Sequence, residues 1–269
     1  MIDTISIKIT DFQINNFELF KEKNNNDMKS FFENPMDFNC QLNAHLKRIK
    51  DGIYRPNIFV HSNYYILPTM YIKFSVSKLL FNNNLIEPKE DNFKDIINKL
   101  VNILNDLEII VERETIKTAL LKRIDFSKNI ILVKGVMYSD FIKMLKEIRF
   151  NRMKIFYEND KFIKFYSKSL SILFYDKIEE MKKHKITIAN FSEIVLMAEH
   201  RILRIEIQIK GDYGINKRLA NDILKLSKKT KLTFQQVYCE KVFKQVFEYI
   251  LKELHRKLPN IIVDGRENE

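Results

Sequence analysis

The residues of this chain best suited to chemistry lie on three short segments in which polar and apolar side chains alternate. The segments are RIDFS at 123–127, ILFYDK at 172–177 and RIEIQIK at 204–210. Successive side chains of a β-strand point to opposite faces, so each alternation gathers its polar side chains on one face. Acidic residues, basic residues and a tyrosine are gathered in this way.

The pattern alone leaves two interpretations of these polar faces open. In the first, they are outer faces of an antiparallel sheet lined by ladders of arginine and carboxylate side chains, which is favoured for any single strand. In the second, the three strands are neighbours, so that Asp125 and Glu206 meet and Tyr175 stands beside them. Two carboxylates can hold a hard divalent cation, which polarises a phosphoryl oxygen. A tyrosine becomes a nucleophile once a metal ion, Lys177 or an arginine stabilises the phenolate. Such groups suit DNA strand transfer through a phosphotyrosine.

Charge and aromatic content point to a polyanion as partner. The chain has 269 residues, with 46 Lys+Arg against 35 Asp+Glu and a formal net charge of +11. Residues 141–190 hold twelve Lys/Arg and six Asp/Glu, which is +6 of that excess, interleaved with phenylalanines and tyrosines. This mixture suits single-stranded nucleic acid, whose bases stack on aromatic rings while cations follow the phosphates. The alternative is a compositional bias towards Lys, Asn and Ile, with the rings in the core.

Other common chemistries find little support. No GxxxxGK[ST], GxGxxG, HExxH or GxSxG motif is present, and the five histidines are scattered. Cys40 and Cys239 lie far apart without a CxxC, which excludes a disulfide framework or zinc ribbon and indicates a reducing compartment. The sequence shows neither a signal peptide nor a run of 18 apolar residues, so we expect a soluble cytoplasmic protein without a membrane span.

Hydrophobic periodicity predicts an α+β domain followed by helices. Strands are expected at 3–9, 108–112, a segment ending at 127, 153–158, 161–167, 169–177 and 203–210, and a β-hairpin at 57–61 and 64–76 with its turn at Ser62-Asn63. Helices are expected at 91–107, at 140–150 with Ser139 as N-cap, at 178–185, and almost throughout 215–257. We therefore expect a catalytic α+β domain over 1–211 and a C-terminal helical region over 212–269.

Five motifs, taken in order, give the sequence a resemblance to a known family. They are the MID opening, KFSVSKLLFNNNLIE at 73–87, RIDFS at 123–127, FYDKIEEM at 174–181 and LRIEIQIK at 203–210. In order and spacing they resemble the gene II/gene X replication initiators of filamentous phages and their plasmid relatives. The resemblance runs from the start of the chain to about residue 210, and the C-terminal helices share only a similar character.

The resemblance implies an antiparallel sheet of the rolling-circle initiator nuclease type, packed with helices, and an enzyme that nicks one DNA strand at an origin. It gives Tyr175 the role of nucleophile, with Lys177 and Glu180 at the other two positions of the Tyr-x-Lys-x-x-Glu motif. The cut strand keeps its 5′ phosphate on the tyrosine and leaves a 3′ hydroxyl for a polymerase. Reversal of the reaction religates the strand.

The same resemblance places the family's two acidic strands at Arg123-Asp125 and Arg204-Glu206. Many rolling-circle initiators hold a metal with a His-hydrophobic-His motif, which this sequence lacks. We therefore expect Mg²⁺ or Mn²⁺ on carboxylates, with Asp125, Glu206 and Glu180 as ligands. Lys177 is expected to stabilise the phosphate or the phenolate.

The expected partner is a single-stranded or hairpin origin in the cytoplasm of a bacterial host, with a host helicase and polymerase acting alongside. The candidate DNA contacts are Arg123, Arg204, Lys164, Lys168 and Lys78. For Lys78 and the Asn run that follows it, a plain turn is the favoured alternative.

Three functional readings remain open at this point. The first is the nicking enzyme with a tyrosine nucleophile. The second is a non-catalytic protein that binds origin or single-stranded DNA on the same fold. The third is a metal-dependent nuclease that uses water without a covalent step. For Tyr175 itself, the structural alternative is a half-buried strand tyrosine whose hydroxyl bonds to a neighbour.

Overall fold

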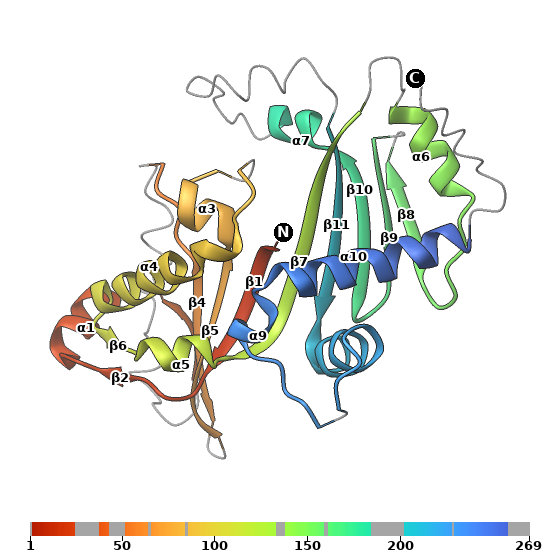
Figure 1. The fold of residues 1–269 in the computed structure, drawn as a ribbon. Coiled ribbons are helices and arrows are strands. Elements are labelled where there is room, and N and C mark those ends of the chain that lie inside the picture. The colour runs from red at the N-terminus through yellow and green to blue at the C-terminus, as the bar shows by residue number, and fades with distance from the viewer. Residues whose placement is uncertain are drawn as a thin grey trace. The chain divides into compact units, whose positions relative to one another are not determined.

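The computed structural model describes residues 2–24, 38–42, 52–63, 66–83, 86–132, 138–158, 161–183, 202–227 and 229–257 (Figure 1). The strand pairs with a defined register run antiparallel, and helices occur between and after them. This combination confirms the predicted α+β class. Among these described ranges, no helix combines the length and the apolar character needed to cross a membrane.

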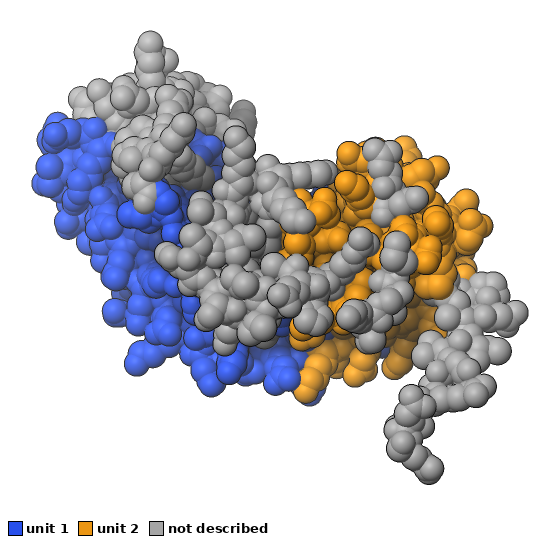
Figure 2. All heavy atoms as spheres, turned by 90° about the horizontal axis from the view of Figure 1, so that it is seen from above, with its two compact units in different colours: residues 1–127, 208–243 blue, residues 128–207, 244–269 orange. Residues whose placement is uncertain are grey.

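The chain forms two compact units, shown in Figure 2. Unit 1 comprises residues 1–127 and 208–243, and unit 2 comprises residues 128–207 and 244–269. The sequence predicted a different division, into a catalytic domain over 1–211 and a helical region over 212–269. That division stays a prediction.

Five strands follow one another in unit 1 in the order β3-β4-β5-β1-β7. Their bounds are β3 (Phe38–Leu42), β4 (Asn57–Asn63), β5 (Ile66–Ser75), β1 (Ile2–Ile9) and β7 (Leu120–Ile131). Alternation along β1 buries Ile5, Ile7 and Ile9, while its main chain pairs with both β5 and β7. The predicted first strand and the predicted hairpin of β4 with β5 are therefore confirmed.

The predicted turn of that hairpin is wrong. Ser62 lies inside β4, where it is buried and pairs with Phe38 of β3. Asn63 pairs with Ile66. Pairing with β3 on its other edge prolongs β4 past the expected turn, because each added residue completes main-chain hydrogen bonds.

Helices and a small two-stranded sheet complete the first half of unit 1. They are α1 (Phe17–Asn24), α3 (Val76–Phe81), η2 (Glu90–Asn92), α4 (Phe93–Asp106), α5 (Arg113–Lys117), β2 (Gln13–Ile14) and β6 (Ile109–Ile110). The helix predicted at 91–107 is confirmed by α4, whose stripe of Ile96, Ile97, Leu100 and Leu104 is buried.

The C-terminal part of the chain contains helices, but the prediction of helix almost throughout 215–257 is wrong, because residues 224–227 and 229–233 are not helical. It contains η3 (Tyr213–Ile223), a π-helical segment, then α9 (Phe234–Val237) and α10 (Glu240–His255). Phe234 is fully buried, and its ring centroid lies 5.9 Å from that of Phe74 and 5.0 Å from that of Phe93. The apolar residues of α9 thus belong to the core of unit 1.

Unit 2 carries four strands in the order β11-β10-β9-β8. They are β11 (Ile202–Lys210), β10 (Leu170–Asp176), β9 (Phe162–Tyr166) and β8 (Lys154–Glu158), accompanied by α6 (Tyr138–Lys146) and α7 (Lys177–Lys183). Alternate apolar side chains form a core, in which the ring of Phe174 lies 6.0 Å from that of Phe141 on α6. The three strands predicted between 153 and 177 are confirmed, with ends that differ by at most one residue.

Three predicted element boundaries in unit 2 are wrong. The helix predicted at 140–150 ends at Lys146. Ser139 is not an N-cap, because α6 already includes Tyr138. The ring of Tyr138 is buried, and its hydroxyl donates a hydrogen bond to the Lys161 carbonyl at 3.0 Å, which fixes this residue in the core. Lys177 is not the last residue of a strand but the first of α7. The reason is Asp176, whose Oδ1 accepts hydrogen bonds from the backbone N–H of Ile178 (2.9 Å) and of Glu179 (3.1 Å).

Candidate functional site

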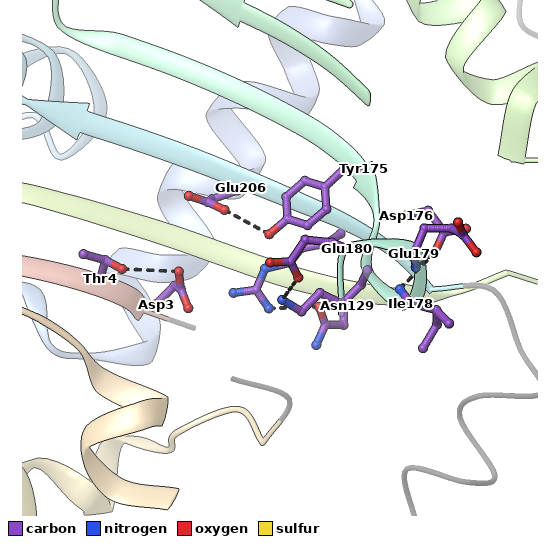
Figure 3. Close-up of polar contacts among 11 residues, drawn as sticks. Asp3, Thr4, Asn129, Tyr175, Asp176, Ile178, Glu179, Glu180 and Glu206 are labelled. Atoms are coloured by element: carbon purple, nitrogen blue, oxygen red, sulfur yellow. Dashed lines mark hydrogen bonds and ion pairs between the residues drawn. The ribbon is translucent and has the colours of Figure 1, made fainter. Parts of the chain in front are cut away.

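The phenol of Tyr175 and the carboxylate of Glu206 meet in unit 2. Tyr175 Oη donates a hydrogen bond to Glu206 Oε2 at 3.2 Å, and Figure 3 shows the two side chains pointing towards each other. Tyr175 is half-buried and Glu206 is 8% exposed. The ring is therefore not enclosed in the core, and its hydroxyl already faces a proton acceptor.

Strand alternation explains why these two side chains meet. β10 and β11 are neighbours in the sheet. Phe174 on β10 and Ile205 and Ile207 on β11 are buried apolar residues. Tyr175 and Glu206 lie between these core positions and so point to the opposite face. The second interpretation of the sequence pattern expected these two side chains, 31 residues apart in the chain, to lie side by side.

Lys177 joins the same site although it lies on a helix. Its side chain is 1% exposed, its Nζ lies 2.6 Å from Glu180 Oε2, and Nζ is 5.9 Å from the centroid of the Tyr175 ring. One turn of α7 brings Lys177 and Glu180 together, because residues three apart share a helix face. Thus the three residues of the Tyr-x-Lys-x-x-Glu motif are gathered, through a helix rather than a continued strand.

Arg204 is a buried residue of this face. It is 3% exposed, and its Nη1 donates to Asn129 Oδ1 at 3.2 Å. Asn129 lies on the last part of β7, beyond residue 127, at which the sequence predicted the strand to end. The sequence feature that indicates Asn129 is the strand-like pattern of Lys128–Ile131, which extends β7 past the RIDFS motif.

Asp125 is held by Arg123 in unit 1. Arg123 Nε lies 2.8 Å from Asp125 Oδ1 and Arg123 Nη2 lies 2.6 Å from Oδ2, a two-pronged ion pair. Asp125 is 1% exposed. Burial, and then the charge of Arg123, lower the pKa of neighbouring Lys73, while Asp125 opposes the shift. Asp125 is thus a buried carboxylate in a positively charged setting, and its predicted role as a metal ligand stays a prediction.

Lys164 lies on the same face of the sheet as Tyr175. In the antiparallel register of β9 with β10, Phe162 lies opposite Tyr175 and Lys164 opposite Leu173. Directly opposed residues share a face. Lys164 Nζ is 5.7 Å from the centroid of the Tyr166 ring, two positions along the strand. Phe162, Lys164 and Tyr166, which we call the β9 face, therefore lie on the same side of the sheet as the candidate nucleophile, with Phe162 directly opposite it.

Lys168 is exposed in the turn between β9 and β10, where it is accessible to a polyanion. Lys78 lies on α3 in unit 1, and its carbonyl accepts the backbone N–H of Asn82 at 2.9 Å. Asn82 adopts a left-handed conformation (φ 59°) that ends α3, and its Oδ1 accepts the N–H of Tyr54. The Asn run therefore begins as a helix cap and turn, as the structural alternative held.

Within the described ranges, no group of three or more His, Cys, Asp or Glu side chains is arranged to hold a metal ion. The carboxylates of Glu206 and Glu180 both lie beside Tyr175 (Figure 3). Magnesium is commonly held by one or two carboxylates, with water and substrate phosphate completing its shell. The predicted role of Glu206 and Glu180 as ligands of such an ion stays a prediction.

A second tyrosine of unit 2 is unsuited to act as a nucleophile. Burial raises the pKa of the Tyr138 hydroxyl far above its ordinary value, and the nearby Asp176 carboxylate raises it further. Tyr138 is 3% exposed, and its hydroxyl donates a hydrogen bond to the main-chain carbonyl of Lys161. Its phenolate is therefore strongly disfavoured.

A scan of the chain against protein-family models finds no matching family, and a search of curated proteins finds no matching sequence.

Proposed function

We propose that this protein is a rolling-circle replication initiator that nicks one DNA strand through Tyr175. The observation that carries the proposal is the hydrogen bond from Tyr175 Oη to Glu206 Oε2 (3.2 Å), a nucleophile paired with an acceptor for its proton. The order of the five sequence motifs supports the family assignment. An antiparallel sheet of the rolling-circle nuclease type is part of the same proposal.

The proposed reaction begins with transfer of the phenol proton to Glu206 as Tyr175 Oη attacks the scissile phosphorus. The bond from phosphorus to the 3′ oxygen breaks, and that oxygen takes up the proton. One product is a free 3′ hydroxyl, and the other is a 5′ phosphate joined to Tyr175. Attack by a 3′ hydroxyl on the phosphotyrosine reverses the steps and religates the strand.

Lys177 stabilises the phenolate in this scheme. Its buried ammonium lies 5.9 Å from the Tyr175 ring centroid, where its charge is poorly screened by water. Glu180 holds Lys177 in place at 2.6 Å. A Mg²⁺ or Mn²⁺ ion held by Glu206 and Glu180 would polarise the phosphate when bound.

The β9 face would hold the unpaired strand next to the nucleophile. Phe162 and Tyr166 offer rings for base stacking, and Lys164 and Lys168 offer cations for the phosphates. Arg123 and Arg204 are less suited to contact DNA, because Arg123 is engaged by Asp125 and Arg204 is buried. Their proposed part is to hold the acidic strands in place.

The experiment is a search for a covalent adduct. Full-length protein is incubated with Mg²⁺ or Mn²⁺ and a pool of 3′-fluorescent single-stranded oligonucleotides with a randomised centre, then resolved on a denaturing gel. We expect labelled protein from the wild type, none from Tyr175→Phe, and an undiminished amount from the matched control Tyr213→Phe, an exposed tyrosine of unit 1.

Other outcomes separate the alternatives. Absence of adduct from the wild type, combined with salt-dependent binding, would support a non-catalytic single-strand binding protein, for which the β9 face is the favouring observation. Cleavage that survives Tyr175→Phe and disappears with Glu206→Ala would support a water-using nuclease.

A further inference from the structure

The outer strand β8 has an unusual combination of exposure and sequence. It is the last strand in the order β11-β10-β9-β8, and it pairs with β9 on one side. Of its five residues, KIFYE, four are exposed and Ile155 is intermediate. Phe156 is 53% exposed and Tyr157 is 55% exposed, one on each face of the strand. An exposed edge with aromatic side chains is a template for strand addition.

The outward-facing main chain of β8 can be identified from its hairpin with β9. The Glu158 carbonyl accepts the N–H of Lys161 at 2.9 Å, so the main-chain groups of Glu158 face β9. Alternate residues of a strand direct these groups to opposite edges. Lys154 and Phe156 therefore face β9 as well, and the N–H and C=O groups of Ile155 and Tyr157 point away from it.

The side-chain order of β8 is complementary to itself when reversed. In an antiparallel pair centred on Phe156, Lys154 lies opposite Glu158 of the partner, and Glu158 opposite the partner's Lys154. Ile155 lies opposite the partner's Tyr157, and the two copies of Phe156 face each other on the two-fold axis. Opposite charges and apolar pairs in direct opposition stabilise antiparallel strands.

The hydrogen bonding agrees with this register. Ile155 and Tyr157, whose main-chain groups point outward, become the hydrogen-bonded pairs, and Phe156 becomes a non-hydrogen-bonded pair with close Cα atoms. Lysines alone would make such an edge repel a second copy. Here the strand carries one charge of each sign, and neither joins an ion pair with another residue of the described ranges.

We propose that β8 pairs with β8 of a second copy of this chain, centred on Phe156, to form a two-fold symmetric dimer. The inference does not depend on the nicking reaction. A five-residue strand buries little area, so the dimer is weak and forms with increasing concentration. Two sheets then become continuous across the axis, and the β9 faces of both copies lie on one surface.

Charge exchange tests the partner and the register together. Sedimentation velocity over a concentration series gives the dissociation constant of the full chain. Lys154→Glu or Glu158→Lys alone places like charges opposite each other twice, and we expect the constant to rise roughly tenfold or more. A mixture of the two single variants, or the Lys154→Glu/Glu158→Lys double variant, restores opposite charges and should restore dimers. Lys143→Glu on α6 is the control and should change nothing.

Cross-linking tests the axis directly. In a background with Cys40 and Cys239 changed to serine, Phe156→Cys should form a disulfide-linked dimer under mild oxidation, because residue 156 faces itself. Tyr157→Cys, which faces Ile155, should form far less. A wild type that stays monomeric at the highest concentration, single variants that dimerise as well as the wild type, or a double variant that stays monomeric would each overturn the proposal.

Discussion

Lys177 Nζ lies 2.6 Å from Glu180 Oε2, with the lysine side chain 1% exposed and the glutamate side chain 31% exposed. This ion pair sits in the first turn of α7, directly after the strand that carries Tyr175. A buried ammonium without a partner is costly, so the pair fixes the geometry of the motif as well as its charge.

Glu180→Gln should therefore lower the stability of the protein. Removing one partner of a fully buried pair costs about 3–5 kcal/mol, and the exposure of Glu180 reduces the expected loss to roughly 1–2 kcal/mol. Urea unfolding followed by circular dichroism measures the change. The control is Glu179→Gln, whose carboxylate lies 3.7 Å from Lys161 in an exposed pair and should matter much less. Equal losses in the two variants would contradict a special role for the buried pair.

Glu206→Gln should slow formation of the covalent adduct without weakening DNA binding. The amide still accepts a hydrogen bond from Tyr175, but it cannot take up the proton, and loss of a general base costs about 10²–10⁴-fold in rate. Single-turnover adduct formation at saturating protein measures the effect. Glu248→Gln on α10 is a control at an exposed position. A rate within about twofold of the wild type would show that another group accepts the proton.

Substitutions on the β9 face should weaken binding of single-stranded DNA. Tyr166→Ala removes a stacking ring and should cost about 1–3 kcal/mol. Lys164→Ala removes one phosphate contact and should make the slope of log K against log salt shallower by about 0.7. Fluorescence anisotropy of labelled oligothymidine over a salt series measures both. Lys143→Ala on α6, which packs on the opposite apolar face through Phe141, should leave both values unchanged.

Lys73 should make the stability of the protein depend on alkaline pH. Burial and the charge of Arg123 lower the pKa of Lys73 in the folded protein below its ordinary 10.5. Between the folded and unfolded values the unfolded chain binds more protons, so the free energy of unfolding rises as the pH rises through this window.

Lys73→Met should remove that dependence, with its largest stabilisation below the folded pKa, where the wild type must hold a poorly solvated charge. Because Lys73 is only partly buried, the gain should be below about 1 kcal/mol. Urea unfolding from neutral pH to pH about 11, above the ordinary lysine pKa of 10.5, provides the test. A wild type and variant whose stabilities differ by the same amount at every pH would contradict the expectation.

Much of the site could be anticipated from alternation. The positions of Tyr175 and Glu206 follow from the two-residue period of β10 and β11, with apolar neighbours that anchor one face in the core. Long strands with one buried face leave little freedom in side-chain direction. The same argument recovered β1, the β4–β5 hairpin and the strands of unit 2.

The parts that could not be anticipated depend on competition between local and distant bonds. The sequence around Asp176 is compatible with either a strand residue or a helix cap. The hydrogen bonds that Asp176 accepts from two backbone N–H groups show that it caps α7. The sequence predicts a turn at Ser62, but Ser62 pairs with Phe38 of β3 and therefore belongs to a strand. Asn129 became recognisable only when β7 was seen to continue beyond Ser127.

The cap at Asp176 has a consequence for the candidate nucleophile. Tyr175 stands at a junction where a strand on one side and a capped helix on the other immobilise the backbone, rather than at the tip of a free loop. The entropy cost of fixing this backbone is therefore part of folding and does not recur each time substrate binds. Loosening that junction with Asp176→Ala should therefore slow strand cleavage while the affinity for DNA stays the same, a signature of lost pre-organisation.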